Sequence, residues 1–151
     1  MLMKFIKWLP LPVGWKARIA CFFQSKFTVS SIVVVFNHKR EVLLFHHTYR
    51  KNPWGLPGGY AHSREHPKAS ITREVFEEAG LKVSKLKQLS IKLDKDLTRL
   101  IICYATKKCV GKFRSSNEVS KVRYFPMSSL PPMPARQEEI IKKALGLIDR
   151  K

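Results

Sequence analysis

Hydrophobic positions change their spacing along the chain, and each change predicts a different element. FTVSSIVVVF, residues Phe27–Phe36, is rich in β-branched residues and predicts a strand. EVLLFHHTY, residues Glu41–Tyr49, predicts a second strand, and the turn at 37–40 between the two indicates a hairpin. NPWGLPGGY, residues Asn52–Tyr60, is dense in glycine and proline, so we expect an irregular strand that leads into a loop.

Two later stretches have helical spacing. Apolar residues recur on one side of His66–Ala79, where Pro67 suits the first turn of a helix and Gly80 ends it. Pro134–Ile148 has apolar residues at the same kind of spacing and predicts a closing helix. We therefore expect one helix in the middle of the chain and one at its end.

Between these helices the pattern returns to strands. Leu81–Leu93 is mixed, Leu97–Thr106 is a strong β run and Val122–Phe125 is a short one. The order is β-rich, helix, β-rich, helix, which predicts an α+β or layered α/β domain with a mixed β-sheet. A chain of 151 residues is long enough for one such domain, which we place at residues 27–151.

The first 26 residues differ from the rest. They are basic and aromatic, and the first acidic residue of the chain is Glu41. Such a segment can lie on an anionic membrane surface, or it can be an extension that packs its aromatic side chains on the domain. We favour packing on the domain, because Pro10 and Pro12 prevent one continuous amphipathic helix.

Composition narrows the class of protein. Hydrophobic residues make up 44% of the chain and aromatic residues 11%, which excludes a disordered protein. The 29 Lys and Arg against 11 Asp and Glu give a formal charge of +18, which attracts nucleotides, RNA, DNA or anionic membranes without choosing among them. Three cysteines without metal-ligand spacing indicate reduced thiols, and no apolar stretch is long enough to span a membrane, so we expect a cytoplasmic protein.

Three glutamates crowd the end of the middle helix. Glu74, Glu77 and Glu78 stand at i, i+3 and i+4 and share one face. Like charges at these spacings cost roughly 0.2–0.5 kcal/mol per pair, and acids near a helix C-terminus oppose the helix dipole. A solvated acidic face is one interpretation. A bound Mg²⁺ or Mn²⁺ is the other, because carboxylates are the hard ligands that these ions prefer.

The loop before this helix favours the metal. It reads GGYAHSRE, from Gly58 to Glu65, and its paired glycines let a backbone approach a ligand closely. A loop that ends at a helix N-terminus can also direct N–H groups at phosphate oxygens. Loop, helix and acidic face together predict a site for a metal–diphosphate complex.

The same residues resemble a known family. Gly59, five residues, Glu65, seven residues and then REVFEEAGL, Arg73–Leu81, match the Nudix box G-x5-E-x7-R-E-U-x-E-E-x-G-U at nine specified positions over 23 residues. The resemblance implies a Nudix-like α/β/α sandwich. It also implies a hydrolase acting on phosphorus-containing acid anhydrides, which cleaves a nucleoside diphosphate linked to another moiety.

The resemblance carries roles over to particular residues. It makes Glu74 and Glu78 the principal metal ligands with Glu77 assisting, and it has Arg73 orient the glutamates through a charge-assisted bond to Glu65. The general base is left open between Glu74, Glu77 and a distal acid. Glu118 is our candidate for a further metal ligand in the second half of the domain, where Lys121 stands in place of a frequent acid. Arg64 replaces a glycine often found before Glu65.

Residues around the box suggest how substrate is held. Gly58 and Gly59 offer backbone, Arg50 and Lys51 can grip a phosphate, and Trp54 and Tyr60 can stack on a base. For the aromatic residues, packing in the core or in a loop is the competing interpretation. His46 and His47 are neighbours on a strand, so one of them should point inward.

Three functions follow from the sequence. The first is a Mg²⁺- or Mn²⁺-dependent pyrophosphohydrolase of a nucleoside triphosphate or of a nucleotide sugar such as ADP-ribose. The second is hydrolysis at the 5′ end of RNA, and the third is a nucleotide-binding regulatory module without turnover. The expected partner is a nucleotide with a diphosphate linkage; an RNA 5′ end, an anionic membrane at residues 1–26 and a homodimer are the alternatives.

Overall fold

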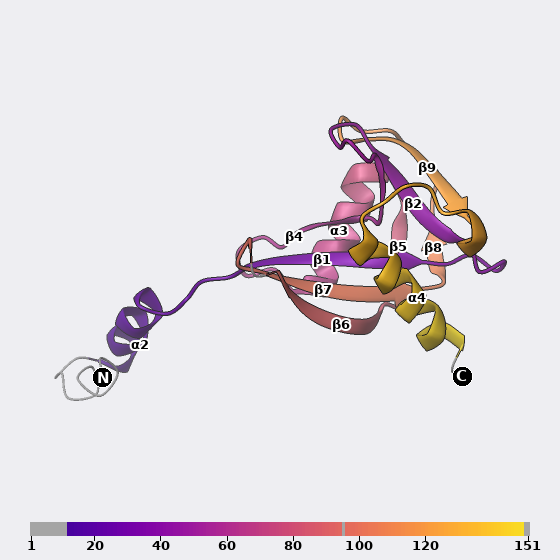
Figure 1. The fold of residues 1–151 in the computed structure, drawn as a ribbon. Coiled ribbons are helices and arrows are strands. Elements are labelled where there is room, and N and C mark those ends of the chain that lie inside the picture. Colours follow the sequence, from indigo (N-terminus) through magenta and orange to yellow (C-terminus); the bar gives the residue numbers. More distant parts are fainter. Residues whose placement is uncertain (1–11, 95, 150–151) are drawn as a thin grey trace.

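The computed structural model describes residues 12–94 and 96–149. From residue 27 onward the order of strands and helices is the one that the sequence predicts, and helix α2 before it was not predicted (Figure 1). They are α2 Val13–Phe22, β1 Thr28–Val35, β2 Val42–His47, β3 Trp54–Gly55, β4 Gly58–Tyr60, α3 Pro67–Ala79, β5 Lys82–Ser84, β6 Lys87–Asp94, β7 Arg99–Thr106, β8 Lys108–Val110, β9 Val119–Phe125, the 3-10 turn η1 Met127–Ser129 and α4 Ala135–Asp149.

The main sheet has the strand order β4-β1-β7-β6. Strand β1 runs parallel to β7, whereas β4 and β6 pair antiparallel with their neighbours. A second sheet, β3-β2-β9, is antiparallel, and β5 and β8 form a small antiparallel pair. The expected mixed sheet is therefore confirmed.

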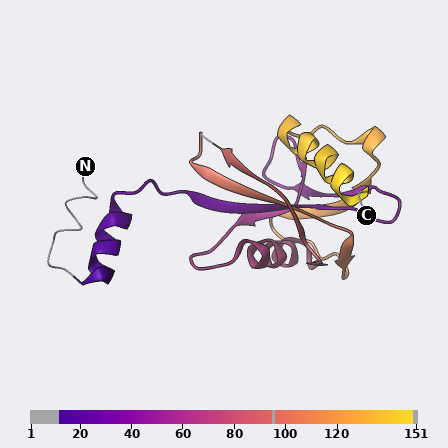
Figure 2. The ribbon, with the colours of Figure 1, turned by 90° about the horizontal axis from the view of Figure 1, so that it is seen from below.

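Strand β1 is buried on both faces, and this builds two cores. Val33 and Val35 pack with α3, whereas Val34 joins the core beneath α4. Successive side chains of a strand point to opposite faces, so a run of valines can supply both layers. Figure 2 shows α3 and α4 on opposite sides of the sheet. The α/β/α sandwich is confirmed.

The expected hairpin is wrong. The turn at 37–40 does connect β1 to β2, but only the bridge Phe36–Val42 links them, and the two strands belong to different sheets. Both edges of β1 are occupied by β4 and β7, which come later in the chain. Strand β2 therefore turns away and pairs with β3 and β9 instead.

The expectation that the N-terminal aromatic residues pack on the domain is also wrong for the described part of that segment. Helix α2 has no buried residue and stands apart from the rest (Figures 1 and 2). Trp15 is 58% exposed and Phe22 is 73% exposed. Helices α3 and α4 already cover both faces of the sheet, which leaves those faces closed to the extension. Residues 1–11 lie outside the described residues.

Within residues 12–94 and 96–149, no helix is both long enough and apolar enough to cross a membrane.

Helix α3 begins and ends as predicted. The His66 side chain accepts a hydrogen bond from the Lys68 N–H at 3.1 Å, and Pro67 occupies the first turn. Gly80 ends the helix with φ +71°, a left-handed conformation that a side chain disfavours. A Cβ on Gly80 would also lie 3.2 Å from the Cβ of Arg114. These caps fix where the acidic end of the helix stands.

We predict that Gly80→Ala lowers the free energy of unfolding by at least about 1 kcal/mol, because alanine is strained at positive φ. Gly146→Ala is the matched control. Gly146 lies in α4 with nothing within 4 Å of an added Cβ, so this change should raise stability by up to about 1 kcal/mol. Urea unfolding of both variants measures the difference, and equal effects of the same sign would contradict the assigned role of Gly80.

Candidate active site

A single guanidinium organises the acidic loop. Arg73 Nε donates to Glu65 Oε1 and Arg73 Nη2 donates to Glu65 Oε2, each at 2.9 Å. The predicted pair of Arg73 with Glu65 is thus present, in the two-point geometry that arginine and a carboxylate favour. The His62 N–H also donates to Glu65 Oε2 at 2.9 Å. Together these bonds hold the pKa of Glu65 at about 2, with Arg73 as the largest cause.

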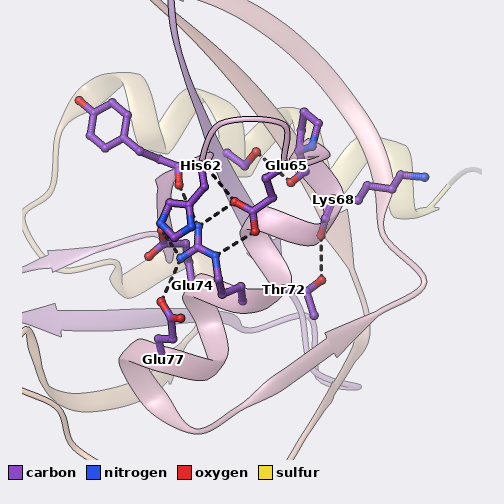
Figure 3. Close-up of polar contacts among 10 residues, drawn as sticks. His62, Glu65, Lys68, Thr72, Glu74 and Glu77 are labelled. Carbon is purple, nitrogen blue, oxygen red and sulfur yellow. Dashed lines mark hydrogen bonds and ion pairs between the residues drawn. The ribbon is translucent and has the colours of Figure 1, made fainter.

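The same guanidinium reaches the helix glutamates. Arg73 Nη1 donates to Glu74 Oε1 and to Glu77 Oε2, each at 2.9 Å, and Nη2 donates to the Tyr60 carbonyl at 3.0 Å. Figure 3 shows Glu65, Glu74 and Glu77 gathered around it. We call Arg73, Glu65, Glu74 and Glu77 the Arg73 cluster. It joins the glycine loop to α3 and sets the direction of the Glu74 carboxylate.

Glu78 is placed differently. It is 7% exposed, and its Oε2 atom is buried with no hydrogen-bond partner among residues 12–94 and 96–149. Burial is the largest of the causes that raise the pKa of Glu78 to about 8; the negative charges of Glu74 and Glu118 also raise it, and Arg50 lowers it. A buried carboxylate oxygen without a hydrogen bond is costly, and a cation bound at this atom would offset that cost.

The carboxylate of Glu74 lies against Gly59. A Cβ built on Gly59 would overlap that carboxylate, and one on Gly58 would lie 2.5 Å from Ile32 Cγ2. Neither Gly58 nor Gly59 has a positive φ. These two positions therefore require glycine because a side chain would not fit, and not because of backbone conformation. Short strand β4 can therefore lie directly beside the acidic end of α3.

These groups line one cavity of about 720 Å³. Glu74, Glu78 and Glu118 contribute its acidic side, and Gly58 and Gly59 contribute backbone. Glu118, which comes from just before β9, thus reaches the same space as the α3 glutamates. We call Glu74, Glu78 and Glu118 the cavity acids.

The cavity acids fit a hard divalent cation. The orphaned Glu78 oxygen, close to two more carboxylates, is where such an ion would supply the missing charge. In the described part of the chain, no three acidic, histidine or cysteine side chains are arranged to hold a metal ion together. Mg²⁺ tends to keep several waters and to be held by one or two carboxylates plus substrate phosphates.

The cavity also contains cations that the sequence analysis missed. Arg99 and Arg136 line it together with the expected Arg50. Two signals were available: Arg99 is a charge within a strongly apolar strand, and Arg136 places a cation in the first turn of a helix, against the helix dipole. We call Arg50, Arg99 and Arg136 the cavity arginines.

Of the other residues expected to bind substrate, some line the cavity and some do not. Tyr60 lines the cavity and is 50% exposed, as stacking on a base requires. Trp54 and Lys51 are absent from the lining. Trp54 instead packs edge-on against His46 at 5.0 Å and Phe125 at 4.9 Å between ring centroids, so core packing explains it.

Two other expectations concern nearby residues. His47 is fully buried and His46 is not, so one of the pair points inward as expected. Burial lowers the pKa of His47 to about 4, and neither ring nitrogen has a hydrogen-bond partner among the described residues. Arg64, which stands where the family often has glycine, adopts φ +66°. The local backbone thus keeps the shape that glycine adopts without strain.

With this geometry in place, a comparison with protein families is decisive. A family model described as the NUDIX domain matches residues 26–144. The chain belongs to the Nudix family. The match includes the whole Arg73 cluster, the cavity acids and the cavity arginines.

Individual relatives are more distant. Diphosphoinositol polyphosphate phosphohydrolase 3-beta of Bos taurus is 38% identical over 72 residues, which are 47% of this chain and 37% of that protein. The chain thus spans little more than a third of the length of the curated relatives it matches.

Solved structures show the same fold. The NUDIX domain of Shewanella oneidensis NrtR, cocrystallised with ADP ribose, has a TM-score of 0.74 at 18% identity and covers 91% of this chain and 99% of that one. An ADP-ribose pyrophosphatase from Streptococcus suis has a TM-score of 0.65 at 21% identity, with coverage of 83% and 95%. The Bos taurus relative is a phosphohydrolase by name and the Streptococcus suis protein is a pyrophosphatase by name.

The raised pKa of Glu78 predicts a pH dependence of stability. Above its ordinary pKa of 4.5, the unfolded carboxyl has lost its proton while the folded one keeps it until about pH 8. The free energy of unfolding of metal-free protein should therefore fall as pH rises from 6.5 to 8, by at most about 1.4 kcal/mol per pH unit. The lowered pKa of His47 makes the free energy of unfolding rise with pH, but only below the ordinary histidine pKa of 6.5. The range from pH 6.5 to 8 lies above that effect.

Denaturant unfolding at several pH values, in chelator, measures this slope. The Glu78→Gln variant should lack it, and saturating Mg²⁺ should flatten the wild-type curve because the ion favours the ionised carboxylate. Parallel curves for wild type and variant would show that Glu78 does not titrate in this range.

Proposed function

We propose that this protein is a Mg²⁺- or Mn²⁺-dependent Nudix hydrolase that cleaves the diphosphate linkage of a nucleoside diphosphate derivative. The observation that carries the proposal is the buried carboxylate of Glu78, whose Oε2 has no hydrogen-bond partner in the described part of the chain, beside Glu74 and Glu118 in a cavity large enough for a nucleotide. A divalent ion held by Glu74 and Glu78 would neutralise phosphate oxygens and lower the pKa of a bound water.

Other residues of the site would position the glutamates, accept a proton and bind the base. Arg73 holds Glu74 in place from outside the cavity lining, so it acts by positioning. Glu77 binds Arg73 through Oε2 and is 56% exposed, which suits the same supporting role. Glu74 and Glu118 face the cavity, so one of them is the better placed to accept a proton from the attacking water. Tyr60 offers a ring on which a base can stack.

A second substrate class has its own support. The cavity arginines add positive charge beside the cavity acids, and the Bos taurus relative is named for diphosphoinositol polyphosphate. A diphosphate on a heavily phosphorylated small molecule is therefore our second candidate. The 5′ end of RNA is a third, supported only by the overall charge of +18.

We predict that wild-type protein with Mg²⁺ hydrolyses at least one member of a panel containing nucleoside triphosphates, ADP-ribose, a diphosphoinositol polyphosphate and a 5′-triphosphorylated oligonucleotide. Glu78→Gln should lower kcat by at least about 100-fold, because it removes a charged ligand at the reacting centre. Glu139→Gln is the matched control, since Glu139 is exposed on α4 outside the cavity.

The panel also separates the alternatives. Turnover of the oligonucleotide alone would support the RNA candidate. Binding without turnover of any compound, with either metal, would favour the regulatory module and contradict our proposal. Equal activity of wild type and Glu78→Gln would remove the metal site from its assigned place.

We also propose that α2 docks on an anionic lipid surface. Trp15, Ile19 and Phe22 stand at i, i+4 and i+7 on one side of the helix, and Phe23 beyond its end is 60% exposed. Arg18 and Lys26 lie over the rings of Trp15 and Phe22 respectively. No acidic residue precedes Glu41, so the whole segment is attracted to negative headgroups.

Cosedimentation of the full chain with vesicles tests this docking. Binding should be at least about tenfold stronger to vesicles with phosphatidylserine than to pure phosphatidylcholine, given several cations near the surface. The triple change Trp15→Ser, Phe22→Ser, Phe23→Ser should abolish it. The matched control is Ile91→Ser with Leu93→Ser, which removes exposed apolar side chains from β6. Loss of binding in the control alone would place the contact on the sheet edge instead.

A further inference from the structure

We infer that Arg99 and Arg136, held together by Asp94, form a second anion-binding subsite in the cavity. Its ligand is a phosphate-sized group that the substrate carries in addition to the diphosphate that is cleaved. This inference rests on the proposed function, because it assumes that the diphosphate lies at the cavity acids. We call Asp94, Arg99 and Arg136 the Asp94 cluster.

The geometry of the cluster is compact. Arg99 Nη2 and Arg136 Nη1 both donate to the same oxygen, Oδ2 of Asp94, each at 2.9 Å. Asp94 is 5% exposed, and it ends the edge strand β6 opposite Arg99 on β7. One buried carboxylate therefore gathers two guanidinium groups from a strand and a helix, and both line the cavity.

The cluster retains positive charge. Two guanidinium groups share one carboxylate, so the cluster carries a net charge of +1. Arg99 Nε is buried without a hydrogen-bond partner among the described residues. The Arg136 side chain is 51% exposed and stands in the first turn of α4, where the helix dipole disfavours a cation. A bound anion would supply the missing negative charge and a hydrogen-bond acceptor. Guanidinium groups are well suited to bind phosphate.

Strand order sets the distance from the cavity acids. Strands β4 and β7 lie on either side of β1, so they are roughly 10 Å apart. Gly59 on β4 lies against Glu74, whereas Arg99 begins β7. Gly59 pairs with Ser31 and Arg99 pairs with Thr28, so the two positions are also offset by three residues, roughly 10 Å, along β1.

Tyr60 connects the two centres. Its hydroxyl lies 3.0 Å from Arg99 Nη1 and its ring centroid lies 5.6 Å from the Arg99 guanidinium carbon. Its carbonyl accepts from Arg73 Nη2 at 3.0 Å. Tyr60 lines the cavity together with the cavity acids and the two arginines, and contacts from both clusters fix its orientation.

A purely structural role for the Asp94 cluster would leave the position of Arg136 unexplained. Asp94 paired with Arg99 alone would already join β6 to β7, as their register requires. Arg136 adds a second, half-exposed cation that lines the cavity and is opposed by its own helix. The specific prediction is that the cavity prefers a diphosphate bearing a phosphomonoester over the same molecule without it.

ADP-ribose and ADP-ribose 2′-phosphate form a matched pair for the test, at 150 mM salt with Mg²⁺. Wild type should have a KM at least about tenfold lower for the phosphorylated compound, given the strength of charged hydrogen bonds. Arg136→Gln should remove the ratio between the two KM values, and Arg136→Lys should restore part of it. Lys142→Gln, which removes a cation from an exposed position on α4 outside the cavity, should keep the full ratio.

Binding of the same two compounds to metal-free protein, measured by calorimetry, gives a readout independent of turnover. The same preference and its loss in Arg136→Gln are expected. Turnover of both compounds with equal KM, or an equal effect of Arg136→Gln and Lys142→Gln, overturns the subsite while the proposed function stands. Turnover of neither compound tells against the proposed function for this class; the calorimetric ratio then decides the subsite alone. Thermal melting of each variant confirms that it is folded.

Discussion

The guanidinium of Arg73 is the contact on which the site depends. It binds both oxygens of Glu65, one oxygen each of Glu74 and Glu77, and the Tyr60 carbonyl. Without this cation, the carboxylates that end α3 would repel one another and the glycine loop would lose its attachment to the helix. The cluster therefore stabilises the acidic end of the helix, while Glu78 Oε2 stays buried with no hydrogen-bond partner among the described residues. Arg73 thus serves both the stability of the helix end and the proposed chemistry.

The arrangement of charge in the cavity follows from the fold. Strands β4, β1, β7 and β6 lie side by side, so Gly59 with Glu74 at one end of this order and Arg99 with Asp94 at the other open onto the same space. Helix α3 supplies acids from one side of the sheet, and α4 supplies Arg136 from the other. A cavity with separate acidic and basic centres suits a substrate that carries a metal-bound diphosphate and further negative groups.

Local patterns predicted most of the elements, and their failures have a common cause. The bounds of α3 followed from Pro67 and Gly80, whose backbone preferences act within one turn. The hairpin failed because the partners of β1 are β4 and β7, which come later in the chain. For Trp54 the sequence left stacking on a base and packing both open, because its neighbours His46 and Phe125 meet it only across β2, β3 and β9.

The sequence by itself determined the family, the acidic face of α3 and the pairing of Arg73 with Glu65, because these belong to one motif of 23 residues. It also determined α3 and α4, because helical spacing of apolar residues is a local pattern. Only the tertiary structure decided which distant residues share the cavity. Glu118, Arg99 and Arg136 lie at least 19 positions beyond Gly80 and reach Glu78 and Tyr60 through strand order and helix packing. No periodicity along the chain encodes that meeting, because it depends on which strands pair across the sheet.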